Sequence, residues 1–311
     1  MSLAELATDP NVRWILLATL LLGMSSGVLG CFAYLRKQSL MGDALSHAAL
    51  PGVCIAFMLT GIKSLWFFMI GAAVAGAIAT FGIGFITRRS RIKQDAALAI
   101  VLSAFFGVGI MLLTRIQQSG SGSQAGLDKF LFGQAAAMIQ SDVYTMSALA
   151  AFLIAVCALF FKQFKLISFD VGFARMIGYP TAALEQFLML LLVVAVVVGI
   201  QAVGVVLMAA MLITPAVAAR YWTERLGVMA ALAGAFGAAS GVLGTMVSTV
   251  ANRLPTGPLA VLAATGIFVV SVLFAPRRGL VAKRLQRAKV ERDARREQAR
   301  RVGAPEKGVS A

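Results

Sequence analysis

Long, almost uninterrupted apolar runs dominate the sequence, and short polar stretches separate them. The runs cover residues 14–35, 44–60, 65–87, 96–114, 143–161, 183–200, 202–219, 226–248 and 258–275. Several approach the roughly 20 residues that a helix needs to cross a bilayer, so each run predicts a membrane-spanning helix. The runs 183–200 and 202–219 meet at Gly199, Ile200 and Gln201 with almost no loop. They could form a tight hairpin, or one could enter the membrane and return, so we expect eight or nine spans.

Basic residues follow alternate apolar runs, which indicates the orientation of the chain. Basic clusters lie at residues 36–37, 88–93, 162–165, 220–225 and 277–278. Because loops rich in Lys and Arg stay in the cytoplasm, all five clusters are expected there. The N-terminus is then outside, the C-terminus is cytoplasmic, and the number of crossings is odd. The first apolar run is longer than the core of a signal peptide, so we expect no cleaved targeting segment.

The composition agrees with an all-α integral membrane protein. Hydrophobic residues make up 59% and charged residues 13% of the chain, against about 25% charged residues in soluble domains, which excludes a water-soluble globule. Cys31, Cys54 and Cys157 lie inside apolar runs without paired spacing and are interpreted as small buried hydrophobes.

Much of the net charge of +15 lies in the last 36 residues. Residues 276–311 hold twelve basic and four acidic residues, a balance of +8, so we divide the chain into a transmembrane domain, 1–275, and a basic cytoplasmic tail, 276–311. The tail lacks aromatic residues, which disfavours nucleic acid as a partner. Attraction to anionic membrane lipid is the expected role.

Asp43 and His47 are the most informative polar residues in the apolar runs. An ionisable side chain inside a membrane costs roughly 2.5 to 3.5 kcal/mol on insertion scales, and His47 is the only histidine of the chain. On a helix, the i, i+4 spacing places both side chains on one face. A carboxylate with an imidazole suits Mn, Fe(II) or Zn. Two ligands are too few for a closed site, but a two-fold dimer would supply four. Alternatively, the two side chains only satisfy one another.

Neighbouring residues qualify this site. Pro51 frees the carbonyl oxygen of His47 from its helical partner and could kink the helix. Cys54 projects on about the same face as His47, but packing is the favoured role.

The segment 200–225 contains Gln201, Gly204, Thr214 and Pro215 among small residues, which favours close helix packing. Met208 and Met211 are likewise assigned to the core.

Residues 115–142 and 162–180 are not plain spans. The first contains a Gly/Ser-rich linker and is expected outside, with a short interfacial helix at 130–139. In the second, Phe169, Phe173 and Ile177 recur at i, i+4 and i+8, which predicts one short amphipathic helix. It would end at Gly178 and Pro180. On pattern alone, an ordinary interfacial loop helix is an equal alternative.

Three segments, in order, carry a resemblance to a known family. Residues 36–52, RKQSLMGDALSHAALPG, strongly resemble a signature of manganese/zinc/iron-type ABC importer permeases. Ile167 to Asp170, with Ala174 and Gly178, resembles the cytoplasmic coupling segment of that family. Residues 201–204 and 214–216 resemble its later membrane motif, and the resemblance covers roughly residues 12–275.

The resemblance implies a helical permease with the cobalamin-type (type II) importer fold. It implies a homodimer, or a pair with a related permease, that two cytoplasmic ATPase subunits power and an extracytoplasmic metal-binding protein supplies. It also implies that Asp43 and His47 meet the transported metal. Residues of the coupling segment would dock on the ATPase, namely Phe169, Asp170, Ala174, Arg175 and Gly178. The tail is longer than the family suggests, so no role is carried over to it.

Three function classes therefore remain. The first is an ATP-driven importer for Mn, Zn or Fe that works by alternating access, with the metal as cargo and no permanently bound cofactor. The second is an ion-gradient-driven divalent metal transporter or channel. The third is a membrane scaffold in which Asp43 and His47 form only a polar contact. An enzyme is the least expected class, because the sequence has no phosphate-binding loop with its Lys-Ser/Thr and no HExxH motif.

Overall fold

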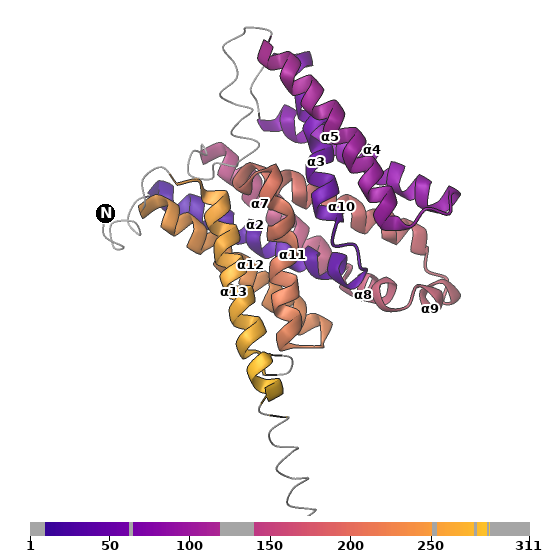
Figure 1. Ribbon diagram of the computed structural model, residues 1–311, viewed down its shortest axis with the longest axis vertical. Helices are drawn as coiled ribbons and strands as arrows, with labels where there is room; N and C mark the ends of the chain where they lie inside the picture. The colour runs from indigo at the N-terminus through magenta and orange to yellow at the C-terminus, as the bar shows by residue number, and fades with distance from the viewer. Residues whose placement is uncertain are drawn as a thin grey trace, which may run out of the picture.

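The structure is a computed structural model that describes residues 10–61, 65–118, 140–250, 254–276, 279–284 and 286. Throughout these residues the regular secondary structure is helical (Figure 1). The helices are, in chain order, α2 (Pro10–Leu35), α3 (Met41–Thr60), α4 (Leu65–Arg89), α5 (Gln94–Gln118), α7 (Gln140–Leu159), α8 (Phe161–Phe169), α9 (Val171–Met176), α10 (Thr181–Val203), α11 (Val205–Trp222), α12 (Leu226–Val250) and α13 (Thr256–Phe274).

Eight of these helices are long and apolar enough to cross a membrane, and α11 is a shorter apolar helix. The predicted all-α integral membrane fold is therefore confirmed, with α11 as the ninth apolar element. The expected junction at Gly199 to Gln201 is wrong, because α10 continues through these residues and ends at Val203. The break lies at Gly204, whose φ of 94° is readily adopted only by glycine.

Helix α2 lies at the centre of a larger group of helices, where it contacts α7, α8, α10, α11 and α12. Small residues let it approach α12 and α11 closely. Gly23 and Gly27 face the backbone of α12 at Gly237 and Ala233, and Gly30 faces the Leu212 carbonyl group of α11. A Cβ atom at any of the three glycines would overlap that backbone. Water does not drive helices together inside a lipid bilayer, so van der Waals contact between closely packed helices stabilises their association instead.

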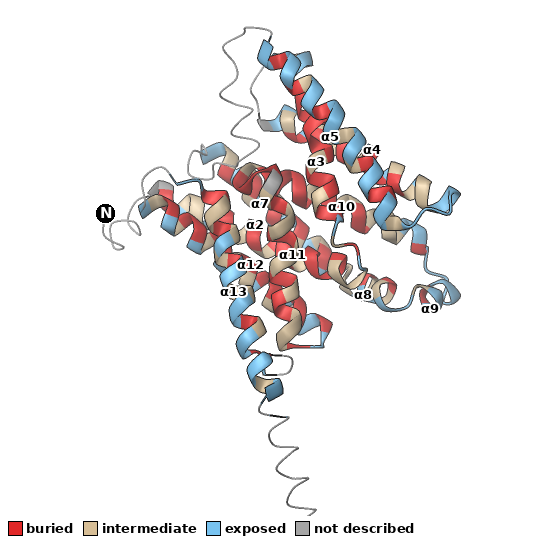
Figure 2. Ribbon diagram, viewed as in Figure 1, coloured by how far each residue is buried: buried red, intermediate tan, exposed pale blue. Residues whose placement is uncertain are grey.

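Helices α3, α4 and α5 form a second group beside this one (Figure 1). Gly52 of α3 and Gly71 of α4 lie against each other's backbone, and Gly109 of α5 packs on Leu50 of α3. Figure 2 shows buried residues along α2 and α10 and exposed residues along α4 and α13. Large apolar side chains such as Phe81 and Leu262 are among the exposed ones, as expected of surfaces that face lipid or another apolar partner.

Two expectations concern residues outside the described part of the chain. The predicted helix at 130–139 lies there entirely. Of the predicted tail, only residues 276, 279–284 and 286 are described. Both expectations remain predictions.

Candidate functional site

Asp43 and His47 lie together at the start of α3. Asp43 is in the first turn of the helix, where the helix dipole favours a carboxylate. His47 follows one turn later, and its Nε2 atom lies 3.4 Å from Oδ1 of Asp43. Side-chain exposure is 42% for Asp43 and 18% for His47. The pair is therefore preformed and open on one side.

The other ring nitrogen of His47 has no visible role in the fold. Nδ1 is buried and has no hydrogen-bond partner among the described residues. The imidazole stands edge-on against the ring of Phe106 on α5, with ring centroids 4.7 Å apart. Because buried polar atoms are nearly always paired, this nitrogen needs a partner that the described residues do not supply.

Glycine contacts fix the position of α3 around the pair. Gly42, beside Asp43, packs on Ala209 and Leu212 of α11. One turn beyond His47, Leu50 and Pro51 lie about 3 Å from where a Cβ atom of Gly109 would be. The segment that follows Gly204 thus supports the start of α3 by packing, which agrees with the packing role predicted for it.

The distance between the two ligand atoms is compatible with a shared cation. Nε2 and Oδ1 are farther apart than the 2.7–3.2 Å usual for hydrogen bonds. If both atoms bound one ion at about 2.1 Å, their 3.4 Å separation would give an angle of about 108°, close to tetrahedral. A single copy offers too few ligands, since the described residues include no group of three or more His, Cys, Asp or Glu side chains that could hold a metal.

Cys54 does not join the pair. Its Sγ atom lies 3.9 Å from the carbonyl oxygen of Gly109 and is buried between α3 and α5. Met208 is likewise buried, and Met211 accepts a 3.9 Å contact from the Ser240 hydroxyl group. These positions agree with the core roles expected for all three side chains.

The predicted coupling segment forms two helices rather than one. The short helix predicted to carry Phe169, Phe173 and Ile177 is interrupted, because α8 ends at Phe169 and α9 begins at Val171. Asp170 separates them in an extended conformation, and its Oδ1 atom accepts a 2.8 Å hydrogen bond from the Phe173 backbone N–H. An N-cap of this kind starts a new helix. Gly178, with a φ of 91°, ends the segment.

An apolar surface is exposed on this segment. Its large members are Phe169, Phe173, Met176, Ile177 and Tyr179, and Met176 is the most exposed at 82%. We call these five residues the coupling surface. Ala174 is fully buried beneath it, whereas Arg175 and Asp170 are exposed.

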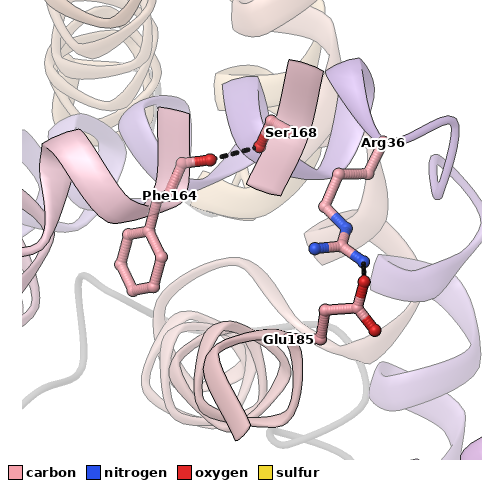
Figure 3. A network of polar contacts seen from close by, with 4 residues as sticks. All are labelled: Arg36, Phe164, Ser168 and Glu185. Atoms are coloured by element: carbon pink, nitrogen blue, oxygen red, sulfur yellow. Dashed lines mark hydrogen bonds and ion pairs between the residues drawn. The ribbon is translucent and has the colours of Figure 1, made fainter. Parts of the chain in front are cut away.

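An aromatic cluster joins α8 to the transmembrane helices. The ring of Phe164 on α8 packs against Phe32 of α2, with centroids 5.7 Å apart, and against Phe187 of α10, at 6.1 Å. Phe160 also contacts Phe187, at 5.2 Å. Beside this cluster, Arg36 forms an ion pair with Glu185 of α10, at 2.9 Å (Figure 3). The coupling surface is therefore attached to the end of α2 from which the chain enters α3.

Sequence reasoning missed Glu185 and Phe106. Glu185 is a lone acid at the start of an apolar run, and the cost of burying a charge was a usable signal. Phe106 carries no such signal, because its contact with His47 joins two helices and depends on the tertiary fold.

Comparisons with known proteins agree with this architecture. The model of the ABC 3 transport family matches residues 8–275. The manganese transport system membrane protein MntC of Bacillus subtilis is 56% identical over 93% of this chain, and the chain spans 66% of that relative's length. The zinc transport system membrane protein TroC of Treponema pallidum is 46% identical, over 93% of this chain and 97% of the relative. The chelated iron transport system membrane protein YfeD of Yersinia pestis is 34% identical over 85% of this chain and 86% of that relative.

Two solved structures share the fold. PsaBC from Streptococcus pneumoniae, in complex with Fab, aligns with a TM-score of 0.77 and 35% identity over 88% of this chain and 95% of the other. An inward-facing conformation of a putative metal-chelate type ABC transporter aligns with a TM-score of 0.68, over 86% of this chain and 87% of the other, at 15% identity, a likeness of fold alone. The family match and these relatives together show that the chain belongs to the ABC 3 transport family, a family of metal ABC importer permeases.

Proposed function

We propose that this chain is the membrane-spanning permease subunit of an ATP-driven importer for a divalent transition metal ion, Mn, Zn or Fe. The observation that carries the proposal is the Asp43–His47 pair, preformed at 3.4 Å at the start of α3 with one side open. Relatives named for manganese, zinc and iron transport support this cargo class. The metal is substrate, and it binds only in passing.

A second permease copy completes the metal site. One copy supplies a carboxylate and an imidazole, and a two-fold partner would supply the same two groups. The partner is a second copy of this chain or a related permease. The 42% exposure of Asp43 leaves an open side for those ligands. Such a shared site releases its ion when movement of α3 separates the two Asp43–His47 pairs, which transport requires.

The coupling surface is the contact for the cytoplasmic ATPase. It presents five large apolar side chains around α9, and Arg175 adds an exposed cation beside them. Apolar side chains in that density need a partner, and aromatic residues and Met are enriched in protein interfaces. The buried Ala174 packs α9 against the body of the permease, and the cap at Asp170 fixes where α9 begins.

Movement passes from this contact to the metal pair through α8. The Phe164 ring links α8 to α2 and α10, and only residues 36–40 separate the end of α2 from the start of α3. When the two ATPase subunits close on ATP, α8 shifts with them and the start of α3 moves. The pair then faces alternately an extracytoplasmic binding protein and the cytoplasm.

Metal uptake by reconstituted vesicles tests this function. Vesicles would contain the full-length chain, with and without its ATPase, and uptake of radioactive Mn, Zn and Fe would be measured with ATP on the cytoplasmic face. Asp43→Asn and His47→Gln are each expected to lower uptake at least about tenfold. Asp142→Asn, an acid in the first turn of α7, is the matched control and should transport normally.

The same experiment separates the alternatives. Uptake by the chain alone, driven by an ion gradient, would replace the importer with a gradient-driven transporter. Unchanged uptake by the Asp43→Asn/His47→Gln double variant would reduce the pair to a structural contact.

A further inference from the structure

A polar cavity lies on the predicted cytoplasmic side, apart from the metal pair. It measures about 260 Å³ and lies between the turn after α2, α4 and the start of α10. Its polar lining includes Arg36, Gln38, Thr87, Arg88, Glu185 and Gln186. A single water needs only about 10–15 Å³ of such a cavity, so there is room for a polar group much larger than water.

Arg36 lines this cavity and has donors that are unpaired among the described residues. Its side chain is 10% exposed, and Nη2 is paired with Glu185 at 2.9 Å. Nε and Nη1 are buried without a hydrogen-bond partner among the described residues, as is Nε2 of Gln186. Three N–H-bearing atoms of the lining are therefore unpaired, against one unpaired acceptor, Oε1 of Gln38. This excess of donors favours a ligand rich in hydrogen-bond acceptors.

The charge of the lining favours an anion. Arg36 and Arg88 carry two positive charges and Glu185 one negative charge, which leaves +1 among the lining residues. Arg89 adds a further cation next to them and stacks over the Phe85 ring at 6.0 Å. Guanidinium groups bind phosphate oxygens with paired, charge-assisted hydrogen bonds.

An apolar groove adjoins the cavity along α4. The groove measures about 830 Å³ and shares Gly84, Arg88 and Gln186 with the polar cavity. Ile78, Phe81 and Phe85 line it from α4, and all three are exposed. On α10, Ala182 and Ala183 form its other wall. The polar cavity and the apolar groove therefore lie next to each other along the same part of α4.

We propose that this combined site binds one anionic phospholipid of the cytoplasmic leaflet. Its phosphate accepts hydrogen bonds from Arg36, Arg88 and Gln186, and an acyl chain lies in the groove between α4 and α10. A free phosphate would leave the groove empty, and a second copy of this chain, which carries a net charge of +15, does not complement the net positive lining of the cavity. Basic pockets between membrane helices on the cytoplasmic side bind anionic headgroups in the same way. This inference goes beyond the proposed function, because it requires a membrane but no metal.

Native mass spectrometry of the full-length chain tests the site. The detergent-solubilised protein would be titrated with phosphatidylglycerol or phosphatidylcholine, with and without inorganic phosphate. Wild type should retain one phosphatidylglycerol per chain, in preference to phosphatidylcholine and despite phosphate. Arg88→Gln should lower retention about tenfold, and Ala183→Trp should lower it similarly by filling the groove. Arg91→Gln, in the turn after α4, is the matched control and should retain lipid as wild type does.

A second variant addresses the buried arginine. The double change Arg36→Gln/Glu185→Gln removes both charges together, so it leaves no unpaired ion, and it should also lower retention about tenfold. If it fails to fold, Arg88→Gln and Ala183→Trp decide the outcome.

Four results would overturn the proposal. Equal retention of phosphatidylcholine would exclude selection of an anion. Displacement by inorganic phosphate would identify a free-anion site. An equal loss with Arg91→Gln would indicate diffuse surface charge. Dissociation of a dimer by Ala183→Trp, with lipid retention unchanged, would make the groove a contact between copies.

Discussion

The imidazole of His47 meets the ring of Phe106 edge to face, with their planes 76° apart and their centroids 4.7 Å apart. This contact joins α3 to α5 beside the candidate metal pair. Nε2 of the imidazole faces Asp43 and Nδ1 is buried and unpaired among the described residues, so the Phe106 ring acts together with Asp43 to set the orientation of the imidazole. Phe106 is therefore a positioning residue in the proposed transport site.

Replacing Phe106 with Leu should weaken metal binding during transport. Such aromatic contacts contribute about 0.5–1.5 kcal/mol, so the KM for metal uptake should rise roughly two- to tenfold with little change in maximal rate. Initial uptake rates across metal concentrations measure this change. Phe106→Tyr should restore the wild-type KM, and Phe152→Leu, an exposed position on α7, is the control. An unaltered KM in Phe106→Leu would remove this residue from the site.

A glycine packed between α12 and α2 and a glycine of α13 in open space should respond differently to substitution. A Cβ atom at Gly237 would overlap the backbone of Gly23, whereas one at Gly266 of α13 would meet open space. Gly237→Ala should lower the free energy of unfolding by about 1–3 kcal/mol. Gly266→Ala should leave it unchanged or raise it by up to about 1 kcal/mol, because alanine favours the helix. Unfolding in detergent, followed by circular dichroism, compares them, and equal stability of the two variants would contradict the packing described.

The membrane helices were predictable because long apolar runs leave few alternatives to helix in lipid. The position of the break within residues 183–222 was not. Gly199 and Gly204 are both glycines in apolar surroundings, but Gly199 stays helical and packs on the Met208 side chain. Only tertiary packing distinguishes the two positions.

Only the part of the candidate site that lies on one helix was predictable from the sequence. Asp43 and His47 are close along one helix, so their spacing alone predicts that they meet. Phe106 and Glu185 meet their partners across helices, and no local pattern contains that pairing. The cap at Asp170 could have been expected, since Asp is one of the residues preferred at the N-cap of a helix, where its side chain accepts a hydrogen bond from the backbone N–H three residues later.

The coupling surface predicts that two apolar side chains carry much of the ATPase contact. Met176 and Ile177 are 82% and 54% exposed. A Met176→Ala/Ile177→Ala double variant should lower the amount of ATPase that co-purifies about tenfold, because a few apolar anchors dominate most interfaces. Lys165→Ala on α8, also exposed, is the control. Full co-purification of the double variant would place the ATPase contact elsewhere.

The Arg36–Glu185 ion pair should stabilise the junction between α2 and α10. Glu185→Gln leaves the buried guanidinium without its counter-charge, so the free energy of unfolding should fall by about 1.5–3 kcal/mol. The Arg36→Gln/Glu185→Gln double variant should lose less than the sum of the single variants. Thermal unfolding in a neutral detergent without added anionic lipid measures this cycle. Additive losses would show that the pair contributes nothing through its mutual contact.

Two substitutions of Asp170 distinguish a structural from an electrostatic role of its side chain in the proposed contact with the ATPase. Its Oδ1 atom caps α9 by accepting the Phe173 N–H at 2.8 Å, and an Asn side chain can accept the same bond without the charge. Asp170→Ala should remove the cap, at a cost of about 1 kcal/mol to α9, and lower ATP-dependent uptake. Asp170→Asn should retain uptake close to wild type, because the cap survives. If Asn impairs uptake as strongly as Ala does, the carboxylate charge itself contacts the ATPase, and the capping explanation is wrong.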